Sequence, residues 1–501
     1  MIYADIQRLI DYSIKNDLIT KDDELVVRNM LMDALHVYDW TDVSHAPSDE
    51  ATADASIDDI LKPLIDFACA NSVIEDTSAN RDLFDTKLMG IVTPMPREVI
   101  RDFKAEYEKS PEAATEWYFA ISQKLNYVRA GRIAKDLKWK YQSEYGLLDI
   151  TVNRSKPEKD PRDIAKAGAT KSAAYPKCQL CAENMGYAGR HDHPARQNLR
   201  PIPMTVGGGD WYLQYSPYGY YNEHCIVFNS EHIPMVIDAV VFDKLFDFVA
   251  AFPHYFVGSN ADLPIVGGSI LSHEHFQGGH YTFAMAAAPV ESSFALGDFP
   301  HVNAGVVKWP MSVIRLQSSD RGELSKACAH VLKNWRAYTD ESVNIRAFTG
   351  DTPHNTITPI ARMKDGMYEC DLVLRNNITS EDRPLGVYHP NPSLHHIKKE
   401  NIGLIEVMGL AVLPARLAVE LEEVKNALLS GDDLTANPLT ASHAEWAQTV
   451  KKNHPELNDD NAMDIIRAEV GAVFEQVLCD AGVFKRDEAG TQAFKRFIAT
   501  L

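Results

Sequence analysis

The stretch Ser272–His280 reads "SHEHFQGGH" and brings three histidines and a glutamine close together. Its spacing excludes the zinc-protease helix, in which two histidines lie four residues apart so that both ligands share one helix face. A spacing of two is that of a strand, on which His273, His275 and Gln277 project from the same face. Two imidazoles and an amide on one face suit a phosphate group, because a ring nitrogen is a nucleophile and an amide is a hydrogen-bond donor.

Glycines precede this strand in the segment "IVGGSIL", Ile265–Leu271, and they let the backbone approach a ligand closely. A polar strand with solvated histidines is the alternative interpretation, and for a lone histidine it is the better one. The cluster beside the glycines favours a phosphate site instead. His280 lies beyond the alternating run, so we expect a structural place for it, or one at the edge of a substrate.

Composition restricts the class of protein. The chain has 501 residues, of which 45% are hydrophobic, enough for a large core and, by length, about two to four domains. It has no apolar run near the ~20 residues of a membrane span, and its N-terminus lacks the pattern of a secretory signal. We therefore expect a soluble, cytoplasmic protein without a membrane partner.

Charge and cysteine content narrow the class further. The formal net charge of -20 argues against a nucleic-acid partner, because such binding depends on neutralising phosphates. A small phosphorylated substrate needs only a local group of donors and stays possible. The seven cysteines are odd in number and mostly far apart, which indicates reduced thiols.

Three parts follow one another along the chain. Residues 1–145 are predicted to be helical, as in "SPEAATEWYFAISQKL", where Ser110 is a suitable N-cap and Pro111 suits the first helical position. Residues 146–410 alternate short β-type runs with turns, and residues 411–501 are helical again. The predicted fold class is α+β, with the mixed core between two helical segments.

Two stretches of the middle part have a clear pattern. In "DWYLQYSP", Trp211, Leu213 and Tyr215 alternate with polar residues, as in a half-buried strand. The segment "FDKLFDFVAAFPHYF" predicts a helix that ends before Pro253. These two patterns support the mixed character of the core.

The close cysteine pair lies in "CQLC", Cys178–Cys181. Two thiolates at this spacing suit one tetrahedral metal, whereas the βαβ context of a thioredoxin-like redox pair is missing. A zinc site needs two further ligands, and the residues alone do not choose between two sets. The candidates are His191 and His193 by proximity, and His232 and His273 by position.

A further polar stretch, "VYHPNPSLHHIKKENIGLIEVMG", contains Lys399 and Glu406. Basic groups suit a phosphate, and a carboxylate suits the hydroxyls of a sugar. A polar loop that leads into a helix is an equally good interpretation from these residues alone.

At "GSNADLPIVGGSILSHEHFQGGHY", Gly258–Tyr281, the chain resembles the histidine-triad superfamily and, within it, the galactose-1-phosphate uridylyltransferases. The CxxC pair and a single histidine between the two motifs fit that family. The helical N-terminal part and "CQLCAENMGYAGR" resemble its long second class, known from Gram-positive bacteria. The resemblance covers about residues 150–410, and it departs from the common pattern at Glu274, where proline is usual.

The resemblance implies a reaction. It implies a transfer of UMP from UDP-glucose to galactose 1-phosphate in galactose metabolism, which gives UDP-galactose and glucose 1-phosphate by a ping-pong mechanism. His275 resembles the nucleophile that carries the uridylyl group, and Gln277 resembles the amide that stabilises the phosphoryl charge. Asn260 and Ser269 resemble contacts to the nucleotide phosphates.

The resemblance also implies a metal site and an architecture. Cys178, Cys181, His232 and His273 resemble the ligands of a structural zinc ion. Lys399 and Glu406 resemble contacts to the hexose phosphate and the sugar. The family is built on an antiparallel sheet from two related halves, here with an expected boundary near residues 300–340, and it forms homodimers.

Two other functions use the same residues. Another histidine-triad nucleotidyltransferase, such as a dinucleoside polyphosphate phosphorylase, would share His275 and use phosphate as the acceptor. A non-catalytic protein that binds UDP-sugar and zinc would bind the nucleotide without forming a covalent adduct.

Overall fold

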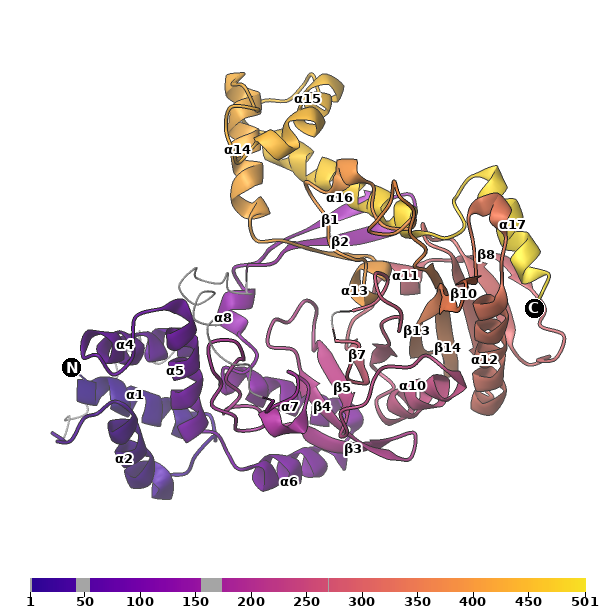
Figure 1. Cartoon of the computed structure of the whole chain (residues 1–501). Helices are drawn as coiled ribbons and strands as arrows, with labels where there is room; N and C mark the ends of the chain where they lie inside the picture. Colours follow the sequence, from indigo (N-terminus) through magenta and orange to yellow (C-terminus); the bar gives the residue numbers. More distant parts are fainter. Residues whose placement is uncertain (1, 42–54, 155–173, 269) are drawn as a thin grey trace.

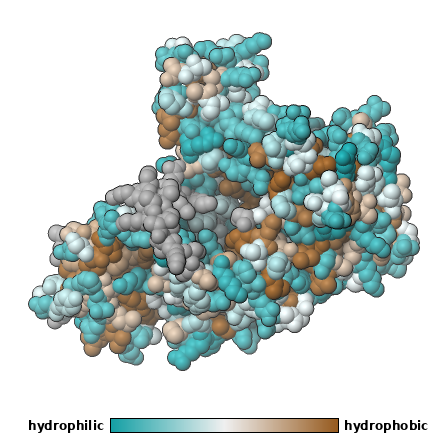
Figure 2. Space-filling view, in the orientation of Figure 1, coloured by the Kyte–Doolittle hydropathy of each residue, from teal (hydrophilic) through white to brown (hydrophobic). Residues whose placement is uncertain are grey.

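The computed structural model describes residues 2–41, 55–154, 174–268 and 270–501. N-terminal helices lie at one end, a large sheet lies in the middle, and C-terminal helices project from it (Figure 1). Hydrophilic residues cover most of the face shown in Figure 2, where the lobe of C-terminal helices stands apart at the top. Within the described ranges, no helix combines the length and apolarity that crossing a bilayer requires.

The N-terminal part is helical, as the sequence predicts. Ser110 accepts a hydrogen bond from the Ala113 amide and caps its helix, with Pro111 in the first turn, so the predicted helix start is confirmed. The helices of this part are α1 Ile2–Lys15, α2 Glu24–Ala34, α4 Ile57–Ala70, α5 Ser78–Ile91, α6 Pro96–Tyr107, α7 Pro111–Lys124 and α8 Ala130–Ile133.

The middle of the molecule is a 10-stranded antiparallel sheet in the order β3-β4-β5-β7-β6-β13-β14-β10-β9-β8. The strands of one half are β3 Ile202–Val206, β4 Gly209–Tyr215, β5 Cys225–Asn229, β6 Phe256–Gly258 and β7 His275–Gly279. Those of the other half are β8 Val290–Phe294, β9 Asn303–Val307, β10 Val313–Ser318, β13 Asn355–Lys364 and β14 Met367–Asn376. A small hairpin, β11 Phe348–Thr349 and β12 Thr352–Pro353, precedes β13.

The strand order repeats. Each half has three strands, a helix and two more strands, and in each half the last strand lies between the third and the fourth. The helices are α10 Ala239–Ala251 and α12 Arg321–Ala337, and the halves join where β6 pairs with β13. This repeat bears out the two related halves expected for the fold, which the sequence alone did not reveal.

The two faces of the sheet differ. On the face covered by α10 and α12, Phe276 of β7 stacks on Trp211 with ring centroids 5.0 Å apart. Trp211, Leu213 and Tyr215 of β4 are all buried, which confirms the predicted strand. Helix α10 ends before Pro253, also as predicted.

The opposite face of the sheet carries the polar residues of β7. It is partly covered by α11 Ala284–Ala287 and α13 Leu404–Val407. A 3-stranded sheet follows, in which β2 Gly146–Val152 pairs with β1 Leu137–Ser143 and, in parallel, with β15 Leu410–Leu413. The last helices are α14 Leu417–Ser430, α15 Ala444–Asn453, α16 Ala462–Ala481 and α17 Glu488–Ile498. The α+β class with helical ends is thus confirmed, while the exact limits of the three parts stay predictions.

Candidate functional site

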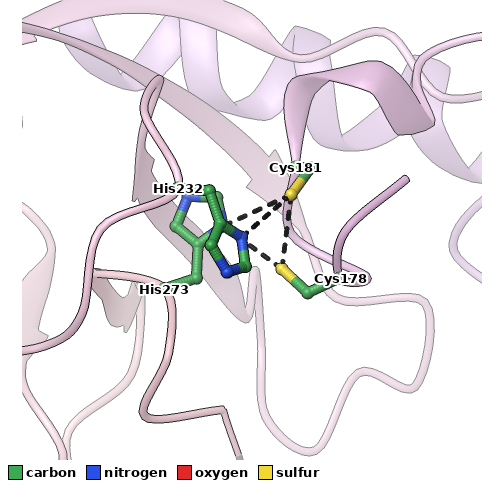
Figure 3. Close-up of side chains that lie close together, drawn as sticks. All are labelled: Cys178, Cys181, His232 and His273. Atoms are coloured by element: carbon green, nitrogen blue, oxygen red, sulfur yellow. Dashed lines mark hydrogen bonds between the residues drawn. The ribbon is translucent and has the colours of Figure 1, made fainter. Parts of the chain in front are cut away.

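Cys178, Cys181, His232 and His273 form one cluster in the described part of the chain (Figure 3). The Cys178 sulfur lies 3.5 Å from the Cys181 sulfur and 3.2 Å from Nδ1 of His273. The Cys181 sulfur lies 3.2 Å from Nδ1 of His232. With metal–ligand bonds of about 2.0–2.3 Å, the edges of a tetrahedral site are about 3.3–3.8 Å, close to these distances, so the residues could hold one metal ion.

The surroundings orient the ligands. Nε2 of His273 lies 2.8 Å from the carbonyl oxygen of Asn229. If Nε2–H donates to that oxygen, Nδ1 carries a lone pair that points toward the sulfurs. Asn184 donates to the carbonyl oxygens of both cysteines. His193 contacts Asn184 at 2.7 Å, so it supports the cysteine loop and does not contact the sulfurs. Of the two histidine pairs the sequence left open, the structure brings His232 and His273 to the thiols.

Burial acts on the thiols. It raises the pKa of Cys181 to about 11, with a further contribution from the neighbouring thiol of Cys178. Without a cation the Cys181 thiol therefore stays protonated at neutral pH, and a metal ion would favour its thiolate.

His275 is the first residue of β7 and is buried. Its Nδ1 lies 2.8 Å from the carbonyl oxygen of His273, so Nδ1 carries the proton and Nε2 carries a lone pair. Nε2 has no hydrogen bond to the part of the chain that the structure describes. Burial lowers the pKa of His275 to about 4, which keeps the ring neutral. Strand β7 begins at His275, so His273 lies just before the strand and not on it.

A pocket of about 450 Å³ opens in front of His275. Gln277 and His224 line it beside the nucleophile candidate, and Nε2 of His224 lies 3.0 Å from Oε1 of Gln277. His224 was missed by the sequence prediction, although it lies two residues before Ile226, which pairs with Gln277. His224 directly precedes β5, and its alternation with Ile226 is the signal that would have found it.

The loop after β6 forms one wall of the pocket. Asn260 lines it and accepts a hydrogen bond from the Leu404 amide at 3.0 Å. A Cβ at Gly268 would lie 2.5 Å from Nδ2 of Asn260, so only glycine allows this close approach. Ser269 lies outside the described residues.

The segment that leads into α13 forms the adjoining wall. Glu406 lines the pocket, and its carboxylate accepts hydrogen bonds from Nζ of Lys398 at 2.9 Å and from the Gly403 amide at 3.2 Å. Lys398 is buried and also donates to the Val412 carbonyl. Lys399, the predicted contact, is exposed and is absent from the pocket lining.

Glu274, where the family pattern usually has proline, points away from the pocket. Its carboxylate pairs with Lys244 of α10 and accepts a hydrogen bond from Asn229 at 2.9 Å. The glutamate therefore ties the start of β7 to α10.

The register shows what the second half has at the corresponding positions. Gln277 pairs with Gly258 of β6, Gly258 with Ile360 of β13, and Ile360 with Asp371 of β14. Across the junction of the halves, Asp371 thus corresponds to Gln277, and Glu369 corresponds to His275.

Buried ion pairs occupy this second position. Nε of Arg315 and a terminal nitrogen of Arg362 each lie 2.7 Å from an oxygen of Asp371, and Glu369 pairs with Arg362. Burial raises the pKa of Asp371, and the guanidinium groups of Arg362 and Arg315 more than offset that effect. The second half therefore has two carboxylates, each in an ion pair with arginine, where the first half has an imidazole and an amide.

A duplicated antiparallel sheet with a Cys/His cluster and a buried strand histidine at a pocket suits an enzyme that transfers a phosphorus-containing group. Residues 19–234 match the family described as "Galactose-1-phosphate uridyl transferase, N-terminal domain", and residues 248–448 match its C-terminal domain. The chain belongs to the galactose-1-phosphate uridyl transferase family.

Similar proteins extend over the full chain. A galactose-1-phosphate uridylyltransferase of Halalkalibacterium halodurans is 51% identical over 100% of this chain and 99% of its own length. Those of Clostridium acetobutylicum and Bacillus subtilis are 51% and 48% identical, each over 100% of this chain and at least 98% of their own length. Among solved structures, a yeast Ap4A phosphorylase, Apa2, has a TM-score of 0.34 and 12% identity, covering 69% of this chain and 92% of its own.

Proposed function

We propose that the chain transfers UMP from UDP-glucose to galactose 1-phosphate through a covalent intermediate on His275. The observation that carries the proposal is the hydrogen bond from Nδ1 of His275 to the carbonyl oxygen of His273, which leaves the lone pair of Nε2 free beside the pocket. Full-length relatives named galactose-1-phosphate uridylyltransferase support this choice of substrates.

The reaction has two displacements. Nε2 of His275 attacks the α-phosphorus of UDP-glucose, the bond to the bridging oxygen breaks, and its electron pair leaves with glucose 1-phosphate. A phosphate oxygen of galactose 1-phosphate then attacks the uridylyl-histidine, the N–P bond breaks, and UDP-galactose forms. Both leaving groups are stable, so neither step needs a strong general acid.

The remaining pocket residues have roles in binding. The NH2 group of Gln277 donates to a phosphoryl oxygen, where charge develops in the transition state. Asn260 and the glycine loop before Ser269 hold the nucleotide phosphates, and Glu406 accepts a hydrogen bond from a hexose hydroxyl. The family pattern also suggests Lys399 as a contact to the hexose phosphate. Its side chain is exposed, so it would be free to reach a bound substrate.

We propose zinc as the metal of the cluster of Cys178, Cys181, His232 and His273. Two thiolates and two imidazoles suit Zn²⁺, and four protein ligands make the site closed and structural. The ion would hold His273, whose carbonyl oxygen orients the ring of His275. Elemental analysis of the purified protein tests both the presence and the identity of the metal.

We also propose a cytoplasmic homodimer that acts on UDP-sugars and hexose 1-phosphates, as the family resemblance implies. Light scattering tests the dimer, and cell fractionation tests the location. The catalytic proposal is tested with His275→Ala, which should fold and keep its metal but lose transfer. Substantial transfer by the purified variant would refute it.

A further inference from the structure

We propose that His224 is a positioning residue, which fixes the side-chain amide of Gln277 so that its NH2 group and not its carbonyl oxygen faces the reacting phosphate. The inference rests on the proposed function, since it assigns a further residue to the same site.

The fold places the imidazole of His224 next to Gln277. His224 directly precedes β5 and is 2% exposed. Ile226, two residues further on, pairs with Gln277, and alternate residues of an extended segment share a face, so His224 and Gln277 lie on the same face of the sheet. The rings of Tyr220 and Tyr221 lie 5.4 and 4.5 Å from the imidazole. The aromatic contacts leave the ring little freedom to turn.

The backbone before His224 is strained. Glu223 has a φ of 52°, a left-handed conformation that is unfavourable for a residue other than glycine. Buried contacts hold it there, because the Glu223 carboxylate accepts hydrogen bonds from the Tyr255 hydroxyl and, at 3.2 Å, from Asn222. Strain of this kind persists where the surroundings over-determine the conformation, and it clusters at functional sites.

Burial decides the tautomer of His224. Nδ1 is buried and has no hydrogen-bond partner in the described part of the chain, whereas Nε2 lies 3.0 Å from Oε1 of Gln277. A proton on Nδ1 would leave a buried N–H group unsatisfied, which is unfavourable. An unpaired lone pair is tolerated more readily, so the proton resides on Nε2. Burial also lowers the pKa of His224 to about 4, so the ring has a single N–H group at neutral pH.

The tautomer sets the orientation of the amide. Nε2–H of His224 donates to Oε1 of Gln277, which turns the NH2 group of Gln277 away from His224. That NH2 group has no hydrogen bond within the described residues, and Gln277 lines the pocket with His275. Were the amide reversed, a carbonyl oxygen would face the phosphate and repel it. His224 thus selects the donor without contacting the substrate itself.

A double-mutant cycle tests the inference on the full-length protein. The variants are His224→Phe, Gln277→Ala and the double variant, and the assay is the single-turnover rate of uridylyl-histidine formation from UDP-glucose. We expect His224→Phe to slow the step about ten- to a hundredfold, less than the roughly hundred- to thousandfold loss when such a donor is removed outright, with KM changed little. The double variant should be no slower than Gln277→Ala, because both changes remove the same donor.

Two further variants separate positioning from packing. His224→Gln should recover most of the rate, since its amide can donate to Oε1 of Gln277. His301→Phe, at a histidine whose side chain is 78% exposed, is the matched control and should react like the wild type. If His224→Phe does not fold, His224→Leu replaces it in the cycle.

The outcomes are distinct. Losses that multiply in the double variant, or equal losses in His224→Phe and His224→Gln, would overturn the positioning role. A wild-type protein that forms no adduct would instead refute the proposed function. The rate of the wild type in the same experiment therefore tells the two failures apart.

Discussion

Replacing Lys398 by methionine should destabilise the protein, whereas the same change at the adjacent Lys399 should have almost no effect. The Lys398 side chain is 4% exposed, and its ammonium contacts Glu406 at 2.9 Å and the Val412 carbonyl at 3.0 Å. Burial alone would lower the pKa of Lys398, but the carboxylates of Glu406 and Glu400 raise it above the ordinary value. The ammonium is thus charged and paired, while Lys399 is exposed.

The size of the effect follows from these contacts. Removing one partner of a buried ion pair costs about 3–5 kcal/mol, because the other charge is left uncompensated. Glu406 borders the pocket, so water can reach it in part, and we expect a loss somewhat below that range, about 2–3 kcal/mol. At Lys399, an exposed position, the change should stay within about 0.5 kcal/mol.

Urea unfolding of Lys398→Met and Lys399→Met, followed by fluorescence and by loss of transfer activity, measures the difference. With a slope of about 1–3 kcal/mol per M, the Lys398 variant should lower the midpoint by on the order of 1 M. Equal midpoints for the two variants, or a larger loss at Lys399, would refute the buried-pair interpretation.

Three further predictions concern other parts of the molecule. Cys181→Ala should lose the metal and lower Tm, and chelation of the wild type should lower Tm in the same way; metal content unchanged by elemental analysis would remove Cys181 from the ligand set. His224 has a folded pKa of about 4 against about 6.5 unfolded, so the unfolded state binds more protons and about 3 kcal/mol of stability should be lost as pH falls from 6.5 to 4. His224→Phe should flatten that part of the stability–pH curve, and an unchanged curve would contradict the assignment. Asp371→Ala removes one of the two carboxylates that Arg315 and Arg362 share, so it leaves buried charge uncompensated and should cost about 3–5 kcal/mol; a near-neutral change in urea midpoint would show that the cluster is not stabilising.

The parts of the site that are local in sequence were predictable. The spacing of His275 and Gln277 predicts a shared strand face, and both residues lie on β7. Ser110 with Pro111 predicts a helix start because a cap depends on a few neighbouring residues. Local patterns of this kind are fixed by backbone geometry and need no knowledge of the tertiary fold.

The parts that depend on distant segments were not predictable from the residues alone. Spacing does not decide whether His193 or His273 contacts the cysteine pair. His273 lies 92 residues after Cys181 in the sequence, and only the fold brings the two side chains together. Lys398 and Lys399 are alike in sequence, and only the packing of the loop against β15 buries the first. The duplication of the sheet lies in strand order and register, which leave no repeated motif in the sequence.

The central claim is that His275 carries a uridylyl group, and intact mass after mixing the protein with UDP-glucose alone tests it most directly. The sample should be kept mildly alkaline, because a phosphoramidate is labile to acid. The account predicts a mass increase of one uridylyl group, absent in His275→Ala and discharged by galactose 1-phosphate but not by phosphate. An unmodified mass with UDP-glucose still bound, or an adduct that His275→Ala retains, would contradict it.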